Sequence, residues 1–237
     1  MVYQLLMLIK QMSSARETRL SAHGKTFQYD ISKFPFKDEL EKLFGVELHD
    51  LHNWLGSFEK FERKNDQQTI AHRVFYSNYK EKFEPVYQKF IFNVLSNIID
   101  FPFAYQQIPT FRIGLPGNRF VGEFHNDAKY NHPDFELNFN LGLSNYAKPC
   151  CLMSEMVPNS NEFFPLECNY GEIFSFNHID CLHGSDINTT DETMVSIDFR
   201  LAMMPFYKEV NNKSVNMNSS FKIGSYFSSE IINNLKK

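Results

Sequence analysis

The sequence is short of cysteine and of tryptophan, and it has neither a strong charge excess nor a long apolar run. Its 237 residues include one tryptophan and four cysteines, at Cys150, Cys151, Cys168 and Cys181. None of the cysteines forms a Cys-x-x-Cys pair with zinc or redox spacing, so a disulfide framework is not expected. Reduced thiols in a cytoplasmic protein are the expectation that follows.

The balance of charge excludes a second set of partners. The formal net charge is −4 and the isoelectric point is near 6.1. Neither value gives an electrostatic reason to bind nucleic acid or an anionic membrane.

The opening run Met1–Ile9 is apolar but short, and Lys10 follows it directly. Without a basic n-region or a small-residue cleavage site, neither a signal peptide nor a membrane span is expected.

Phenylalanine is abundant. The chain has 25 Phe and 11 Tyr, with 43% hydrophobic and 22% charged residues overall. Aromatic side chains favour half-buried strands and fill large cores, so the composition indicates a β-rich interior. No repeat, low-complexity tract or interdomain linker interrupts the sequence. We therefore expect a single domain over residues 1–237, in which residues 1–100 are mostly helical support and residues 101–237 form the β core.

The helical part contains three segments with start or stop signals. Residues 37–44 form an amphipathic run that ends at Gly45. Asp66 is an expected N-cap for a second helix, and Pro85 favours the first turn of a third. The apolar stripes of these last two helices are Ile70, Val74, Phe75 and Tyr79, and then Val86, Phe90, Val94 and Leu95. Such stripes usually pack on a core, so we expect the helices to buttress one face of a sheet.

Strand-like runs follow Pro102, separated by proline and glycine. They are residues 103–107, 110–115, 135–143, 151–156, 171–176 and 193–203. Many short strands without βαβ alternation predict a mainly β fold of the jelly-roll type, a double-sheet barrel with helices beside it. Glu136, Asn138 and Asn140 alternate with apolar residues, so one face of that strand is polar. The period alone leaves open whether this face lies inside the barrel or in solvent.

A candidate metal site lies in the stretch from Val121 to Asp127. His125 and Asp127 are two residues apart, so in an extended segment both side chains point the same way. His183 is far enough downstream for several antiparallel strands to bring it back to them. Two imidazoles and one carboxylate suit a non-haem Fe(II), because they leave adjacent coordination positions open. Ordinary hydrogen-bonded histidines are the alternative.

Other histidines offer weaker patterns. A second His-x-Asp copy, His178 and Asp180, leaves no room for a strand before His183. His178 is better explained as a pocket or core residue. His49, Asp50 and His52 lie in a short helical or loop segment with no partner cluster, and we interpret them as surface or capping residues.

Taken together, the motifs from Pro109 to Arg200 resemble the Fe(II)/2-oxoglutarate-dependent oxygenases. The resemblance is to the phytanoyl-CoA-dioxygenase-like branch and to oxygenases of bacterial carbohydrate and aminoglycoside (streptomycin-type) biosynthetic clusters. It covers roughly half of the chain. The matching pieces are residues 111–116, 121–127, 130–133, 136–139, 183–185 with Asn188, and 195–200, and residues 221–227 also look like the branch's C-terminal segment.

The resemblance implies a double-stranded β-helix in which His125, Asp127 and His183 bind iron. It also implies 2-oxoglutarate as cosubstrate and O2 as oxidant, with succinate and CO2 released while a substrate is oxidised, usually by hydroxylation. The substrate class that it suggests is a small polar metabolite, sugar-containing or a polysaccharide precursor. The expected partner is thus a small molecule, with neither nucleic acid nor membrane involved, and a homodimer is left open.

The residues expected to bind the cosubstrate lie on three of the expected strands. The family often carries arginine at the position of Met194, and methionine cannot bind a carboxylate. Arg200 shares a strand face with position 194 and is the expected anchor, with Ser196 beside it, and Arg112 is a second candidate. Asn138 and Asn140 are expected to add hydrogen bonds if their face is internal. The competing function is a non-catalytic, cupin-like jelly-roll module that binds carbohydrate.

Overall fold

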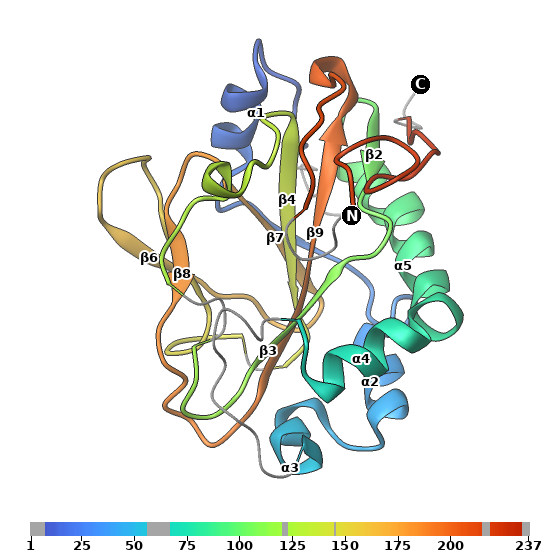
Figure 1. Cartoon of the computed structure of the whole chain (residues 1–237), viewed down its shortest axis with the longest axis vertical. Coiled ribbons are helices and arrows are strands. Elements are labelled where there is room, and N and C mark those ends of the chain that lie inside the picture. The colour runs from blue at the N-terminus through green and yellow to red at the C-terminus, as the bar shows by residue number, and fades with distance from the viewer. Residues whose placement is uncertain (1–7, 56–66, 120–122, 145, 215–218, 234–237) are drawn as a thin grey trace, which may run out of the picture.

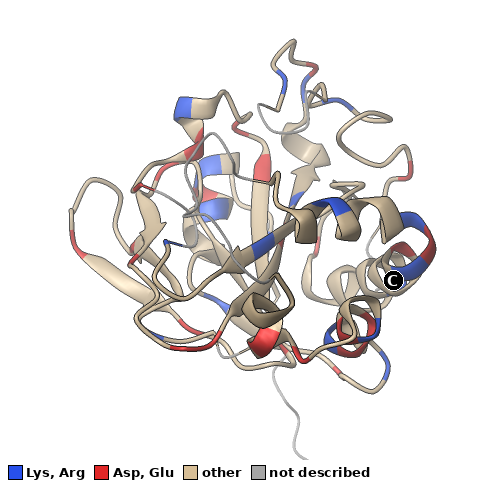
Figure 2. Ribbon diagram, turned by 60° about the horizontal axis from the view of Figure 1, so that its bottom comes forward, with Lys and Arg blue, Asp and Glu red and all other residues tan. Residues whose placement is uncertain are grey.

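The structure is a computed structural model, and it describes residues 8–55, 67–119, 123–144, 146–214 and 219–233. Helices and sheets are segregated in it: the helices lie mainly to one side of a strongly twisted sheet, and a smaller sheet lies on the other side (Figure 1). Within these residues no helix is long and apolar enough to cross a membrane. Basic and acidic residues alternate along the ribbon, in keeping with the small net charge (Figure 2).

The helices come mostly from the first hundred residues. They are α1 (Ala15–Ala22), α2 (Phe36–Phe44), η1 (Leu48–Asp50), α3 (Leu51–Leu55), α4 (Ile70–Asn78), η3 (Tyr79–Phe83), α5 (Glu84–Phe90), η4 (Ile91–Leu95) and α6 (Ser96–Ile98), with short η5 (Asp127–Tyr130) and η6 (Met204–Phe206) later in the chain. The predicted helix that stops at Gly45 is confirmed as α2, because Gly45 has a φ of 71°, which favours glycine.

Two details of the helical prediction differ from the structure. The side chain of Thr69 caps α4 by accepting from the N–H of His72, whereas the expected cap, Asp66, lies outside the described residues. Pro85 lies in the first turn of α5, as expected, but α5 follows α4 and η3 without a break. The segment η3 is a π-helix, and the Glu84 N–H reaches the Tyr79 carbonyl, so the helical path continues from α4 into α5 past the proline.

Two antiparallel sheets form the rest of the molecule. Their strands are β1 (Thr26–Gln28), β2 (Phe103–Tyr105), β3 (Thr110–Gly114), β4 (Glu136–Gly142), β5 (Leu152–Glu155), β6 (Phe163–Leu166), β7 (Glu172–Phe176), β8 (His183–Ser185) and β9 (Met194–Met203). The large sheet has the order β1-β7-β4-β9-β2, and β3 also pairs with β9. The small sheet has the order β6-β5-β8.

The six strand-like runs of the sequence are confirmed within one or two residues, as β2, β3, β4, β5, β7 and β9. Three further strands were not predicted, namely β1, β6 and β8. Each has only three or four residues, and none lies in one of the longer aromatic or β-branched runs from which the other strands were predicted. The mainly β architecture with a helical N-terminal part is therefore as predicted, and β1 adds one strand from that part to the sheet edge.

The two faces of the large sheet differ in chemistry. One face packs on the helices through aromatic residues: Phe111 of β3 stacks on Phe75 of α4, with ring centroids 4.7 Å apart. The other face turns toward the small sheet, and there Glu136, Asn138 and Asn140 of β4 are all buried. The polar face that the sequence could not place is thus internal.

Candidate functional site

His125, Asp127 and His183 come together between the sheets. The backbones of His125 and His183 exchange two hydrogen bonds, of 2.9 and 2.8 Å, so His125 extends the small sheet beside β8. Gly184 allows this approach, because a Cβ there would lie 3.1 Å from the Phe124 Cα. Asp127 begins η5, and its N–H donates to the His178 carbonyl at 2.7 Å.

The three side chains form a compact set of metal-ligand atoms. Asp127 Oδ1 lies 3.4 Å from His125 Nε2 and 3.5 Å from His183 Nε2. One ligand atom from each residue lies within 4.8 Å of the others. Two imidazole nitrogens and one carboxylate oxygen therefore point at a common centre, as the spacing of the sequence predicts.

Hydrogen bonds to the backbone determine which imidazole nitrogens face that centre. His125 Nδ1 donates to the Glu123 carbonyl at 2.7 Å, and His183 Nδ1 donates to the Cys181 carbonyl at 3.2 Å. A carbonyl oxygen can only accept, so each neutral imidazole carries its proton on Nδ1 and presents a lone pair at Nε2. Three electron-pair donors then face one another, and a cation at their centre would satisfy all three.

Arg200 holds the second oxygen of Asp127. Arg200 Nη2 donates to Asp127 Oδ2 at 2.8 Å, which leaves Oδ1 facing the histidines. Burial raises the pKa of the Asp127 carboxyl, but the charges of His132 and Arg200 oppose it and hold that pKa well below its usual range. The carboxylate is ionised at neutral pH, as a metal ligand must be.

The inner wall of the large sheet continues this polar network. Arg200 Nη1 lies 3.3 Å from Asp198 Oδ1, and Arg112 Nε donates to Asp198 Oδ2 at 2.8 Å. Cross-strand register places Asn138 opposite Arg200 and Asn140 opposite Asp198. The cosubstrate-binding residues expected from the sequence therefore lie on one wall, with Ser196 on the same face of β9 opposite Arg112 of β3.

Several buried polar atoms on this wall have no hydrogen-bond partner among the described residues. They are Asn138 Nδ2, Asn140 Oδ1, Ser196 Oγ and Arg200 Nε. An unsatisfied buried polar atom costs about 1–3 kcal/mol, and such atoms are rare in native proteins. Their position on the wall that faces the triad is suited to a polar ligand.

Met194 occupies an apolar part of the interior. It is only 2% exposed and belongs to a cluster that includes Leu152, Phe174 and Phe176. The nearest basic residue on its own strand is Arg200, which shares its face. Position 194 therefore offers no charge to a carboxylate, and the basic side chains that line the cavity at the triad are Arg112 and Arg200.

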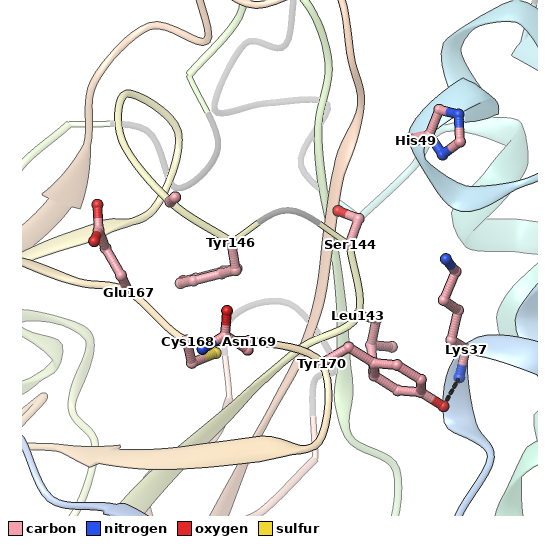
Figure 3. A pocket seen from close by; sticks show the side chains of 10 residues that line it. Lys37, His49, Leu143, Ser144, Tyr146, Glu167, Cys168, Asn169 and Tyr170 are labelled. Atoms are coloured by element: carbon pink, nitrogen blue, oxygen red, sulfur yellow. Dashed lines mark hydrogen bonds between the residues drawn. The ribbon is translucent and has the colours of Figure 1, made fainter. Parts of the chain in front are cut away.

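Two cavities lie at and near the site. The one at the triad has a volume of about 20 Å³, enough for an ion or a water molecule. It is lined by Arg112, His125, Asp127, Asn140, Leu152, Phe176, His183, Asp198 and Arg200. A larger cavity of about 390 Å³ lies between the helices and two strand connections (Figure 3). No triad residue lines it, but the hydroxyl of its residue Tyr146 accepts from Asn140 Nδ2 at 3.4 Å.

The second His-x-Asp copy does not form a ligand pair. His178 is fully buried and contacts Glu136 Oε2 through Nε2 at 3.1 Å, while Asp180 pairs with Arg16 and Arg19. His178 is thus a core histidine, as expected.

The other weak pattern also lies away from the triad. His49 pairs with Glu47 and Asp50, and His52 Nδ1 contacts the hydroxyl of Thr193. Both histidines are therefore explained without a metal.

His132 and Glu136 lie beside the site, and no role in it was assigned to either residue from the sequence. Glu136 Oε2 accepts from His132 Nδ1 at 2.8 Å as well as from His178. Burial raises the pKa of Glu136, but the two histidines outweigh it and lower that pKa to about 2. Both residues lie within the matching motifs, and their separation of four positions was the available signal.

Comparison with known proteins finds a relative by sequence. No protein-family model matches the sequence. The streptomycin biosynthesis protein StrG of Streptomyces griseus is 30% identical over 201 residues, which cover 84% of this chain and 95% of StrG.

Solved structures give weaker matches. AviO1 from Streptomyces viridochromogenes has a TM-score of 0.43 and 14% identity, over 81% of this chain and 96% of AviO1. SnoK, a non-heme alpha-ketoglutarate-dependent carbocyclase from nogalamycin biosynthesis, has a TM-score of 0.44 and 11% identity, over 81% of this chain and 83% of SnoK. These scores are too low to establish a common fold, so the relationship depends on StrG. The sequence identity with StrG confirms the expected link to streptomycin-type biosynthesis proteins: this chain belongs to the family of StrG.

Proposed function

We propose that this protein is an Fe(II)- and 2-oxoglutarate-dependent oxygenase that oxidises a small polar metabolite. The observation that carries the proposal is the convergence of two Nε2 lone pairs and Asp127 Oδ1, at 3.4 and 3.5 Å. Both Nδ1 atoms are engaged by carbonyls, so no hydrogen bond between neutral imidazoles and the carboxylate can satisfy this arrangement. A bound cation can.

The donor set fits iron. Two imidazoles and one carboxylate on one side of a metal leave open positions on the other side, the arrangement of non-haem Fe(II) oxygenases. Arg200 favours this geometry, because its bond to Asp127 Oδ2 limits the carboxylate to one ligand oxygen. With 2-oxoglutarate and O2, iron in such a site supplies the oxidising power for substrate hydroxylation, and succinate and CO2 are released.

The inner wall would hold the cosubstrate. Arg200 and Arg112 are the candidates for its distal carboxylate, and Asn138, Asn140 and Ser196 carry buried polar atoms that need partners. A dicarboxylate in this interior requires a paired charge. The cavity of about 20 Å³ is smaller than 2-oxoglutarate, so the side chains that line it, among them Leu152 and Phe176, would move when the cosubstrate enters.

The strand order supports a double-stranded β-helix. In the large sheet β7, β4, β9 and β3 are neighbours, and in the small sheet β6, β5 and β8 are followed by the bridge at His125. Consecutive strands along the chain therefore alternate between the sheets from β3 onward, with β5 and β6 as a hairpin. Eight segments arranged in this way match the jelly-roll pattern.

The substrate class is inferred from the family. StrG is named for streptomycin biosynthesis, and we propose that this chain likewise acts on a sugar-containing metabolite or a polysaccharide precursor. The four cysteines are free and buried, which agrees with a reducing compartment such as the cytoplasm. A homodimer remains compatible with the proposal.

One observation favours the competing function, a carbohydrate-binding module without catalysis. The cavity of about 390 Å³ has a size suited to a small ligand, and Lys37, Glu167, Asn169 and Tyr170 give it polar and aromatic walls (Figure 3). If that function were correct, sugars would bind here without any need for iron.

Succinate formation tests the proposed function. Purified protein with Fe(II), ascorbate, 2-oxoglutarate and O2 should form succinate slowly even without a substrate, and a mixture of candidate sugar phosphates should accelerate it. Asp127→Ala is the matched inactive control. Succinate at the level of the control, together with metal-independent sugar binding, would favour the binding module.

A further inference from the structure

We infer that Glu136, which is not a metal ligand, is a positioning residue for Asp127: it joins His132 and His178, and these two residues hold the Asp127 backbone. The inference rests on the proposed metal centre and adds a residue to it. It concerns the hydrogen bonds that join Glu136, His132 and His178 to the Asp127 backbone.

The side chain of Glu136 is the hub of this network. Glu136 is fully buried at the start of β4. Its Oε2 accepts from His132 Nδ1 at 2.8 Å and from His178 Nε2 at 3.1 Å. The histidines come from different segments, one after η5 and one after β7, and the shared carboxylate oxygen fixes their separation.

The same two histidines contact the backbone of Asp127 on both sides. The His178 carbonyl accepts from the Asp127 N–H at 2.7 Å, and the His132 N–H donates to the Asp127 carbonyl at 3.3 Å. Movement of either histidine would therefore shift the main chain at Asp127. Arg200 fixes one oxygen of the Asp127 side chain. Glu136 thus helps to set the position of the Asp127 main chain, and Arg200 sets the orientation of its carboxylate.

A second metal site is the competing explanation for these residues. Asp127, His132 and His178 can also place ligand atoms within 4.8 Å of one another. However, Glu136 already accepts a hydrogen bond from one nitrogen of each histidine, and Arg200 Nε lies 3.9 Å from Glu136 Oε2, where its charge opposes a divalent cation. Hydrogen bonding to Glu136 accounts for His132 Nδ1 and His178 Nε2 without another ion.

Cobalt(II) is a suitable probe, because it is stable in air and its visible absorption reports on coordination geometry. We expect the wild-type protein to bind one Co(II) per chain. Glu136→Leu should weaken Co(II) binding by about 10- to 100-fold and change the visible spectrum, as is usual when the support of a metal ligand is removed. Glu136→Gln keeps an acceptor oxygen of the same shape and should retain affinity within several-fold of wild type.

Two comparisons separate positioning from lost stability. Phe75→Ala removes a buried ring in the helical part and should destabilise the fold while leaving the Co(II) affinity and spectrum unchanged. His178→Leu should weaken Co(II) binding as Glu136→Leu does. The double variant should be no weaker than the worse single variant, because both changes break the same link.

The outcomes distinguish the two proposals. If wild-type protein binds no Co(II), the proposed metal centre is wrong. If wild type binds one Co(II) but Glu136→Leu binds it equally well with the same spectrum, the positioning role alone is refuted. Two Co(II) per chain, with one lost in Glu136→Leu, would assign the cluster to a second metal instead. Should Glu136→Leu not fold, His178→Leu takes its place, with Glu136→Gln as the conservative control: wild-type Co(II) affinity and spectrum in His178→Leu would then refute the positioning role.

Discussion

Arg200 is surrounded by more acid than one guanidinium can neutralise. Asp127, Asp198 and Glu136 all lie within 4 Å of its nitrogens. An incoming carboxylate would have to share or displace one of these partners. The sequence indicated Arg200 as a cosubstrate anchor because of its strand parity, but parity contains no information about its contact with Asp127, which depends on how η5 folds back.

Substitutions of Arg200 and Arg112 test which arginine binds 2-oxoglutarate and which one supports Asp127. Arg200→Met should weaken 2-oxoglutarate binding by about tenfold to a thousandfold, since a charge-assisted contact is lost. It should also weaken Co(II) binding, because Asp127 Oδ2 loses its donor. Arg112→Met should leave Co(II) affinity near wild type. If Arg112→Met abolishes 2-oxoglutarate binding and Arg200→Met does not, the anchor is Arg112.

His178 predicts a pH dependence of stability for the metal-free protein. Burial lowers the pKa of His178 to about 4, while in the unfolded chain it stays near 6.5. Above pH 6.5 the His178 side chain is neutral in both the folded and the unfolded protein, so its titration does not change the stability. Between pH 6.5 and 4 only the unfolded chain binds the proton, so the free energy of unfolding decreases as the pH is lowered. From pH 7.5 to 5 the loss should be about 2 kcal/mol, measured by urea unfolding.

The carboxylates act at lower pH than His178, whereas His23, whose pKa is also lowered by burial, acts in the same range, so the test is the change in slope on substitution of His178. The pKa values of Glu136 and Asp127 are lowered in the folded protein, so their stabilisation is present above the unfolded values near 4 and is lost below them. His178→Gln should therefore flatten the profile between pH 7.5 and 5. An unchanged slope in that variant would assign the effect to other groups.

At the scale of elements, β4 and β9 carry most of the polar inner wall beside the triad. Alternation and length made both strands predictable within one residue, because a buried strand of seven or ten residues leaves a clear pattern. The pattern could not tell which face is internal, since that depends on the small sheet. In the small sheet, only β5 was among the predicted runs, whereas β6 and β8 were found from the structure.

Asn138 tests the internal face of β4. Its Nδ2 is buried without a partner among the described residues and faces the triad side. Asn138→Ala should raise the 2-oxoglutarate concentration needed for half-maximal succinate formation by several-fold without loss of Co(II) binding. Ser175→Ala is the matched control, because Ser175 also has a buried, unpartnered oxygen but alternates with the inward-facing Phe174 and Phe176 of β7. Equal effects of both changes would remove Asn138 from the site.

At the scale of the whole molecule, stability and the site depend on opposite faces of one sheet. The helix-facing core is aromatic, and Phe111 lies at its centre between Phe75 and Phe44, with ring centroids at 4.7 and 5.9 Å. The high phenylalanine content predicted such a core. It could not predict which rings meet, because those contacts join segments far apart in sequence.

Phe111→Ala should therefore destabilise the protein without disturbing the metal centre. The expected loss is about 3–5 kcal/mol in the free energy of unfolding, as for other buried Phe→Ala changes. Phe164→Ala, on β6 and 48% exposed, should change it by no more than about 0.5 kcal/mol. Urea unfolding measures both. A loss of Co(II) affinity in folded Phe111→Ala would show that the two faces are not independent.

The measurement that tests the central claim most directly is an anaerobic titration of the Fe(II)-loaded protein with 2-oxoglutarate, followed by visible absorption. A weak charge-transfer band should appear and saturate at one equivalent per chain. It should be absent in His125→Ala, Asp127→Ala and His183→Ala, and present in His49→Ala, whose side chain lies outside the cavity at the triad. A wild-type protein that binds Fe(II) but gives no band at saturating 2-oxoglutarate would contradict the proposed oxygenase.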